Sequence, residues 1–206
     1  MITTADITKF NLSDHVNHCK KLLSSFCELS IINFASVRDY IMTSLCLDNA
    51  SRTGAIANMT IGEFKKATQG KGDVSSVSVL DHKTVETSGP AVLSFSKNLF
   101  DEANTYMSYF RNKLDGINTG DNAKVFVSWN GNTMSSSMVT MQLNSFWGRS
   151  VGNSDETQRF NATKVRKFAV TKAYDEKPEI EKDLALMCNF QNTSNISYYN
   201  KNKNII

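Results

Sequence analysis

The stretch RDYIMTSLCLDNASRTGAIANMT, from Arg38 to Thr60, decides the fold prediction for this chain. It continues an apolar pattern at helical spacing, which predicts a buried helix over residues 36–47. That pattern consists of Val37, Tyr40, Ile41, Leu45 and Leu47. Arg52 follows the helix and stands beside Gly54. The stretch therefore predicts a helix that delivers an arginine to the turn at its end.

Helical spacing continues on both sides of this stretch. One helix is predicted over residues 10–27, with an apolar face of Leu12, Val16, Cys19, Leu22, Leu23 and Phe26. Thr60 and Glu63 have capping-box spacing, which predicts the start of a short helix. Ser96 is expected to cap a longer helix with the stripe Leu99, Phe100, Ala103, Tyr106, Met107, Phe110 and Leu114. Later helices are expected from Ser135 or Ser136 to Trp147, Ala162 to Tyr174, Pro178 to Cys188, and from Thr193.

Two short segments have the pattern of strands. Val74–Leu80 and Ala91–Phe95 are predicted to pair as a hairpin, and the loop between them contains His82 and Lys83. Residues 125–129 form another short apolar segment before an Asn-Gly turn. The expected fold class is therefore mainly α with a small antiparallel β-sheet.

The composition is that of a globular protein. The chain has 206 residues, of which 40% are hydrophobic and 21% charged, and this length suffices for one good core or one domain with an appendage. A net charge of +3 is compatible with nucleic acid but does not establish it. No apolar run is long enough to cross a membrane, and the N-terminus lacks the pattern of a signal peptide.

The cysteines predict a reduced, intracellular protein. Cys19, Cys27, Cys46 and Cys188 have no paired spacing. His15, His18 and Cys19 are candidate metal ligands by residue type. No second ligand pair accompanies them, so a helix surface is favoured and no metal is expected.

Four widely separated positions suit one reaction. Arg52, Lys83, Arg166 and the Tyr198–Tyr199 pair combine two arginines, a lysine and a late tyrosine. Arginine forks bind phosphate oxygens bidentately, lysine can protonate a leaving oxygen, and tyrosine can form a covalent intermediate. Taken alone, Arg52 and Lys83 are more typical of solvated surface charges, and the two tyrosines could simply pack a terminal helix, so only the combination indicates phosphodiester chemistry.

The order and context of these residues resemble the tyrosine recombinases, which are phage-integrase-like, and most closely the Crypton-like recombinases of eukaryotic mobile elements. The resembling stretches are Arg38–Thr60, His82–Ala91 and Val165–Tyr199. The resemblance implies a recombinase catalytic domain over residues 36–199, with a polar tail at 200–206. Residues 1–35 would be an N-terminal helical appendage, the remnant or linker of a DNA-clamp domain, in a shortened relative or a fragment.

The resemblance also implies roles for individual residues. Arg52 and Arg166 would hold the scissile phosphate, and Lys83 would protonate the 5′-oxygen that leaves. Tyr198 would be the nucleophile, with Tyr199 as the alternative, and a 3′-phosphotyrosine would form without a cofactor. The expected partner is double-stranded DNA, with several copies of the chain assembling on it, and neither a membrane nor a small-molecule substrate. The expected location is intracellular, and nuclear if the source is eukaryotic.

Three positions depart from the family pattern. Ala55 stands where an acidic residue often supports the first arginine, and Thr163 where the family usually has histidine. Asn189 stands where the family has histidine or tryptophan, and it is expected to donate a hydrogen bond to the phosphate. These departures favour a second interpretation, a decayed or co-opted recombinase that binds DNA without cutting it. A third interpretation is a protein-interaction domain without any DNA role.

Three further residues are candidates for contact with the DNA backbone. Lys164 and Lys167 flank Arg166, and His82 precedes Lys83. The simplest role of the two lysines is as solvated helix charges or as contacts to DNA phosphates.

Overall fold

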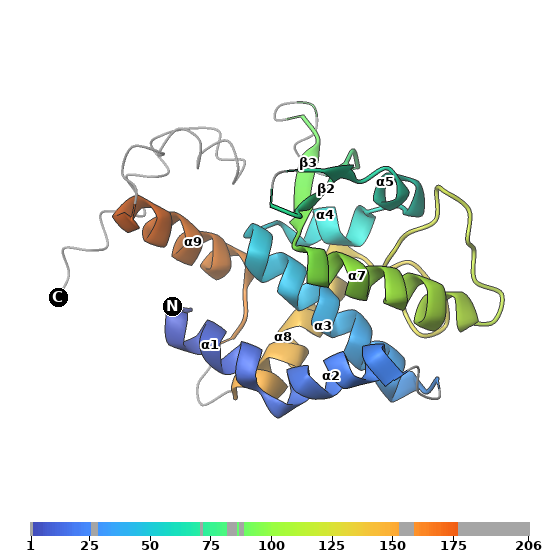
Figure 1. Ribbon diagram of the computed structural model, residues 1–206, viewed down its shortest axis with the longest axis horizontal. Helices are drawn as coiled ribbons and strands as arrows, with labels where there is room; N and C mark the ends of the chain where they lie inside the picture. Colours follow the sequence, from blue (N-terminus) through green and yellow to red (C-terminus); the bar gives the residue numbers. More distant parts are fainter. Residues whose placement is uncertain are drawn as a thin grey trace.

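The computed structural model describes residues 2–25, 29–70, 72–81, 86, 89–152 and 159–176. For residues 173–176 it describes the backbone alone. Its helices and strands are α1 (Thr4–Leu12), α2 (Asp14–Ser25), α3 (Ile31–Asn49), α4 (Thr53–Asn58), α5 (Ile61–Lys65), β1 (Thr68–Gln69), β2 (Ser75–Val79), β3 (Ala91–Phe95), α7 (Lys97–Thr105), α8 (Ser136–Val151) and α9 (Ala162–Glu176). This arrangement, shown in Figure 1, confirms the predicted class: mostly helix with one small antiparallel sheet.

α3 is the central helix of the molecule. It packs against α2, α7, α8 and β3, and also contacts α4 and α9. Ser30 caps its start, with the side-chain oxygen accepting the Asn33 N–H, so the helix is longer than residues 36–47. The expected apolar positions Val37, Ile41 and Leu45 are fully buried. The central element was therefore predicted correctly, although its ends were not.

The prediction of one helix over residues 10–27 is wrong, because the helix is interrupted at Ser13, between α1 and α2. Its backbone is extended there (φ −65°, ψ 145°), and its hydroxyl donates to the Phe10 carbonyl and accepts the Val16 N–H. The break turns Leu12 into solvent, where it is 72% exposed. Phe10 and Val16, on either side of Ser13, still enter the same core.

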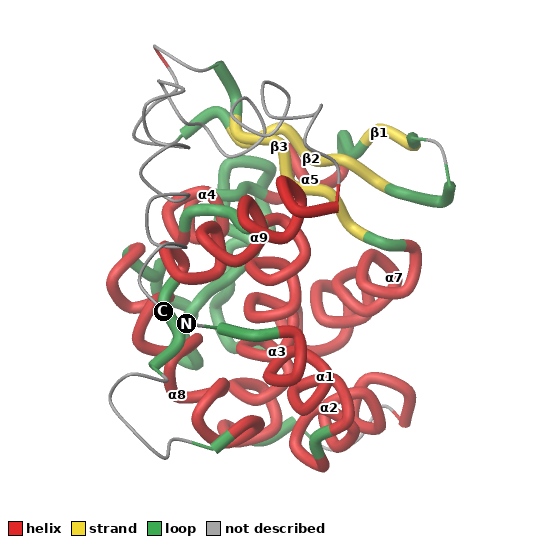
Figure 2. Tube along the Cα trace, turned by 90° about the vertical axis from the view of Figure 1, so that its left-hand side faces the viewer, coloured by secondary structure: helices red, strands yellow, loops and turns green. Residues whose placement is uncertain are grey.

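The sheet lies at one end of the helical layer, as Figure 2 shows. β2 and β3 pair antiparallel from Ser75↔Phe95 to Val79↔Ala91, which confirms the predicted hairpin. β1 adds a two-residue edge that the sequence did not predict. The capping box at α5 is also confirmed: the Thr60 hydroxyl accepts the Glu63 N–H, and the Glu63 carboxylate accepts the Thr60 N–H.

The predicted helix after Ser96 begins as expected but does not stay α-helical. α7 is followed by a π-helical segment, η1 (Tyr106–Phe110), and by a 3-10 turn, η2 (Arg111–Lys113). Its stripe is nevertheless buried at Leu99, Ala103, Tyr106, Phe110 and Leu114. The π turn keeps the stripe in the core and ends beside an arginine that is fully buried.

Arg111 holds the long loop after η2 in place. Its guanidinium donates to the main-chain carbonyls of Asn118 (2.8 Å), Lys124 (2.9 Å) and Val125 (3.2 Å). Burial lowers the pKa of this guanidinium from its usual value. These carbonyls of the loop thus bind the Arg111 guanidinium and not a neighbouring strand. The apolar residues 125–127 pack against the core.

We expect Arg111→Met to lower the free energy of unfolding by about 2 kcal/mol. The methionine fills similar space but leaves buried carbonyls without a donor, while removal of a buried charge recovers part of the loss. Urea unfolding of the variant measures the change. The control is Lys113→Met. The exposed ammonium of Lys113 lies over the Tyr109 ring, and its removal should lower the free energy of unfolding by under about 1 kcal/mol. Equal losses in both variants would contradict this role of Arg111.

Candidate functional site

Arg52 lies in the turn that joins α3 to α4. α3 ends at Asn49 and is followed by Ala50, whose left-handed backbone (φ 47°, ψ 31°) costs about 1 kcal/mol for a residue other than glycine. Arg52 then occupies the N-cap position of α4, and its side chain makes no capping hydrogen bond. A Cβ added at Gly54 would meet no described atom within 4 Å. Among the described residues, therefore, none lies close against the Cα side of Gly54.

Asn49 clamps this turn to the sheet. Its side chain donates to the Ser94 carbonyl (2.8 Å) and accepts the Ser94 N–H (2.6 Å). It also donates to the Leu45 carbonyl (3.0 Å), one helical turn back in α3. One amide thus pairs with both main-chain groups of a β3 residue, and it fixes the hairpin relative to the turn that carries Arg52.

A second set of contacts holds the start of the loop between β2 and β3. The Glu63 carboxylate accepts the Leu80 N–H (2.9 Å), in addition to its capping bonds. The Lys124 ammonium donates to the Asn58 carbonyl (2.9 Å) and lies 3.4 Å from the Asp81 carboxylate. The predicted lysine and its neighbour, Lys83 and His82, follow immediately, but they lie outside the described residues.

Arg166 lies at the start of α9, and α9 packs against α3. Burial raises the pKa of the Cys46 thiol to about 12, and the nearby charge of Arg166 opposes this shift. The Cys46 thiol in turn donates to the Ser51 carbonyl, at 3.7 Å. Arg52 directly follows Ser51 in the turn after α3. Figure 1 shows α9, the helix of Arg166, beside the C-terminal end of α3, against which it packs.

The residues around Arg166 are held by local contacts. The Arg166 guanidinium donates to the Thr163 hydroxyl (3.2 Å), one helical turn earlier, because residues three apart lie on the same face of a helix. The Lys164 ammonium donates to the Arg159 carbonyl (3.2 Å). Asn161 accepts the Thr163 N–H at the start of the helix. Lys167 is half-buried on α9.

Aromatic packing fixes where α9 begins. Phe160 is buried and lies 5.3 Å from Trp147 of α8, measured between ring centres. Trp147 also stacks on Phe10 of α1 at 5.6 Å. The start of α9 therefore rests on a ring cluster that includes the first helix of the chain.

Ala55 cannot be exchanged for an acidic residue without cost. It is 3% exposed and lies in the core under the turn that carries Arg52. A carboxylate at this place would need a buried partner. The remaining predicted site residues, Asn189, Tyr198 and Tyr199, lie outside the described residues, as do the two helices expected after Pro178.

Sequence reasoning missed several residues that hold the site and the central helix in place. Asn49 gave a weak signal, since asparagine is common where helices end. The pair Arg38–Asp39 gave a clearer signal, because two adjacent charges stand in the middle of a helix that is expected to be buried. These side chains are 5% and 1% exposed and form an ion pair at 2.7 Å, while Arg38 also donates to the Val127 carbonyl. Lys124 carried no local signal.

Metal ligation has no support among the described residues. No group of three His, Cys, Asp or Glu side chains in these segments is arranged to hold an ion. His15 instead lies against the Phe146 ring at 4.6 Å, and the Cys19 thiol donates to the Ser36 carbonyl. No helix among these segments is long and apolar enough to span a membrane.

Comparison with known proteins identifies the fold through structure alone. No protein-family model matches the sequence, and no curated protein matches it. The XerH site-specific recombinase bound to palindromic difH substrate, in a post-cleavage complex, matches with a TM-score of 0.67 and 10% identity. The match covers 98% of this chain and 50% of the recombinase chain. The chain has the tyrosine recombinase fold.

A second structure of XerH, a pre-cleavage complex with difH, gives a TM-score of 0.63 at 10% identity. It covers 99% of this chain and 53% of the recombinase chain. The protein therefore spans about half the length of these two recombinase chains. The predicted resemblance to tyrosine recombinases is confirmed at the level of fold, and the closer likeness to Crypton-like recombinases remains a prediction.

We expect Asn49→Ala to lower the free energy of unfolding by about 2 kcal/mol, because both main-chain groups of Ser94 lose their partner. Chemical denaturation measures the loss, and hydrogen exchange at the Ser94 amide should accelerate more than exchange in α8. The matched control is Asn112→Ala, an exposed asparagine in η2. If the two alanine variants were equally stable, Asn49 would not be a clamp.

Proposed function

We propose that this protein cleaves and rejoins DNA as a tyrosine recombinase does. The observation that carries the proposal is the placement of Arg52 and Arg166 near one end of α3, within a tyrosine recombinase fold. Two guanidinium groups can hold the non-bridging oxygens of one phosphate and offset the charge of the transition state. The DNA-bound state of the XerH complexes supports duplex DNA as the partner.

In the proposed reaction, the Tyr198 hydroxyl gives up its proton to solvent water, and its oxygen attacks the phosphorus of a phosphate whose oxygens are held by Arg52 and Arg166. A phosphotyrosine bond forms at the 3′ side while the bond to the 5′-oxygen breaks, and Lys83 gives that oxygen a proton. A 5′-hydroxyl from another strand then attacks the phosphotyrosine and releases the tyrosine. Asn189 donates a hydrogen bond to the phosphate, and His82 and Lys167 contact the DNA backbone. The phosphotyrosine retains the energy of the broken bond, so no nucleotide cofactor is required.

The second candidate function is DNA binding without cleavage. Two observations favour it: Ala55 is buried where the family often has a supporting acid, and the Thr163 hydroxyl takes the place of an imidazole beside Arg166. Threonine can donate or accept a hydrogen bond, but it cannot exchange protons near neutral pH as histidine does. Under this candidate the arginines still bind phosphate.

The finer parts of the proposal rest on the sequence motifs. We infer membership of the Crypton-like branch of mobile-element recombinases, assembly of several copies on DNA, and an intracellular location that is nuclear in a eukaryote. The same experiments on DNA binding and cleavage test the activity on which these inferences depend.

Binding of duplex DNA should weaken as the salt concentration rises, because phosphate contacts release counterions. Arg166→Ala should weaken binding by roughly tenfold, the effect of losing a charge-assisted hydrogen bond. It should also reduce the salt slope by about one. Fluorescence anisotropy with several unrelated duplexes measures both effects.

The control for binding is Lys113→Ala, which removes a positive charge from η2, outside the region of the two arginines. It should leave the affinity within about twofold of the parent, since distant surface charges contribute little at moderate salt. Binding that does not respond to salt, or that responds equally to both substitutions, would support the protein-interaction interpretation instead.

Incubation with a nicked suicide substrate should give a covalent protein–DNA adduct on a denaturing gel. Tyr198→Phe should abolish the adduct, and loss only in Tyr199→Phe would assign the nucleophile to Tyr199. Turnover should be slow, because phenol has a pKa of about 10 and Thr163 cannot take its proton. Thr163→His should therefore increase the rate. Absence of an adduct from every version, including Thr163→His, would favour the binding-only candidate.

A further inference from the structure

Two buried side chains in the segment after α7 carry hydrogen-bonding groups without a partner among the described residues. They are the Tyr106 hydroxyl and the Nη1 group of Arg111. Both side chains are completely buried, at 0% exposure. Buried polar groups in folded proteins nearly always have a partner, so two such groups on one short segment indicate a ligand between them.

The π-helical turn η1 brings these two side chains to the same side of the segment. The Arg111 N–H donates to the Tyr106 carbonyl, five residues earlier, which is the bond that defines a π turn. In a regular α-helix, five residues advance the chain by about 500°, and the two side chains would point about 140° apart. Burial raises the pKa of the Tyr106 phenol, and the charges of Arg38 and Arg111 oppose this rise, as expected for groups that lie close together.

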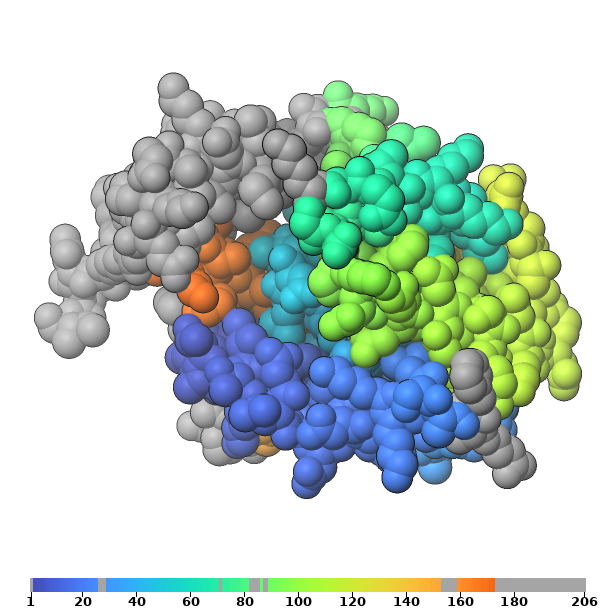
Figure 3. Space-filling view, in the orientation of Figure 1, coloured from blue at the N-terminus to red at the C-terminus, as the bar shows by residue number. Residues whose placement is uncertain are grey.

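Packing and hydrogen bonds hold both groups in position. The Tyr106 ring stacks on Phe126 at 5.7 Å and packs against Phe34 at 5.8 Å, measured between ring centres. The Arg111 guanidinium is held through its Nε and Nη2 atoms, which donate to carbonyls of the following loop. Figure 3 shows that loop in yellow at the surface beside α7. The unused N–H groups at Nη1 and the phenol O–H therefore form a fixed pair of donors.

The charge of Arg111 also lacks a carboxylate partner within the described part of the chain. Arg38 forms an ion pair with Asp39, whereas Arg111 takes part in none of the ion pairs between described residues. The loop carbonyls compensate part of the buried charge, but an interior charge remains costly until an opposite charge accompanies it. Positive charge and unused donors together are what an anion requires.

We propose that a single halide-sized anion, of which chloride is the common example, binds between the Tyr106 hydroxyl and the Nη1 group of Arg111. The anion accepts hydrogen bonds from both groups and neutralises the guanidinium. A water molecule would accept the same bonds, but it would bring two hydrogens of its own into the core and leave the charge unpaired. The site lies outside the proposed DNA cleavage and does not depend on it.

Thermal melting of the full chain tests the proposal, with chloride exchanged for gluconate at constant ionic strength. Gluconate is too large for a site that holds one atom. The melting temperature should rise by about 4 °C when chloride reaches about ten times its dissociation constant, because an ion that binds only the folded state stabilises it. A melting temperature that is the same in both salts would overturn the proposal.

Tyr106→Phe locates the ion, because this change keeps the ring and removes one of the two donors. The rise in melting temperature with chloride should fall to less than half of that in the parent. If the rise were unchanged in this variant, chloride would bind elsewhere and the proposal would fail.

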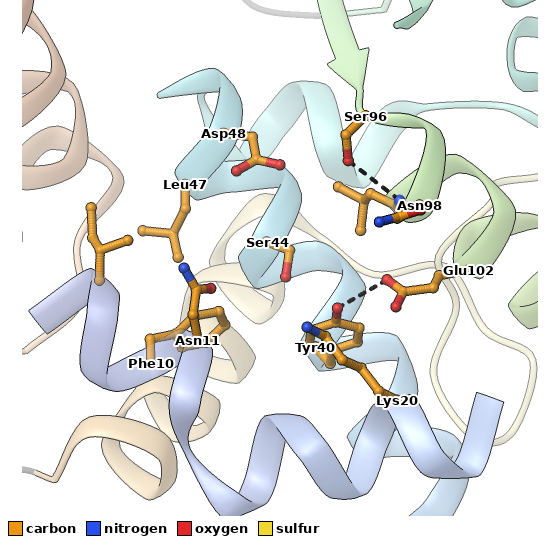
Figure 4. A pocket seen from close by; sticks show the side chains of 12 residues that line it. Phe10, Asn11, Lys20, Tyr40, Ser44, Leu47, Asp48, Ser96, Asn98 and Glu102 are labelled. Atoms are coloured by element: carbon orange, nitrogen blue, oxygen red, sulfur yellow. Dashed lines mark hydrogen bonds between the residues drawn. The ribbon is translucent and has the colours of Figure 1, made fainter. Parts of the chain in front are cut away.

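The matched control is Tyr40→Phe, which removes the hydroxyl of a buried tyrosine that has a partner. Tyr40 lines a cleft between α1, α2, α3 and α7, where its hydroxyl donates to the Glu102 carboxylate at 2.9 Å (Figure 4). This variant should keep the full response to chloride. An equal loss of the response in both variants would also contradict the proposed site.

A crystal of the full chain grown in bromide gives a direct measurement, since bromide scatters X-rays anomalously. An anomalous peak should lie within hydrogen-bond distance of both the Tyr106 oxygen and Arg111 Nη1. A water-sized peak without anomalous signal at this position would show that the ligand is water, and the proposal would be wrong.

Discussion

α3 is enclosed by α2, α7, α8, α9 and β3, so every polar side chain that it carries inward must find a partner within the protein. The Arg38–Asp39 pair meets this requirement in the centre of the molecule, where the guanidinium also reaches the Val127 carbonyl. Thr43 donates to the Asp39 carbonyl in the next turn. Because a buried charge without its partner is costly, these contacts constrain how the surrounding helices and the loop at residue 127 pack on α3.

The same helix separates two regions with different chemistry. Its C-terminal end leads into the turn with Arg52 and lies beside Arg166, so positive charge gathers there. Its face toward α1 and α7 carries Asp48 and lines the cleft with Glu102. Asn49, one residue after Asp48, points instead to β3. Successive helical residues differ in direction by about 100°, so Asp48 and Asn49 meet different neighbours although they are adjacent in sequence.

Local patterns predicted those elements that local forces determine. The capping box at Thr60 and Glu63, the cap at Ser96 and the hairpin strands were all evident in short windows of sequence. The break at Ser13 was missed because the apolar spacing continues across it. Arg111 was missed for a different reason: the carbonyls that it binds belong to a loop that only the folded chain brings to it.

The candidate site was predictable only in part, since its members come from distant segments. Helical spacing placed Arg52 after α3 and Arg166 one turn from Thr163, but no periodicity relates the two arginines to each other. Their common location was expected from family resemblance. The sequence did not identify the anchors of the hairpin, which are Asn49, Glu63 and Lys124. These side chains bind main-chain groups, and every residue has such groups, so the sequence does not show which of them will be bound.

The ring cluster of Phe10, Trp147 and Phe160 links the first helix of the chain mechanically to the start of α9. Deletion of α1, or a bulky fusion that displaces it, would remove one face of Trp147 and loosen the support on which α9 begins. The orientation of Arg166 would then change, although no residue near it had been altered. In any shortened form of this protein, the first dozen residues therefore control the geometry of a helix that begins at residue 162.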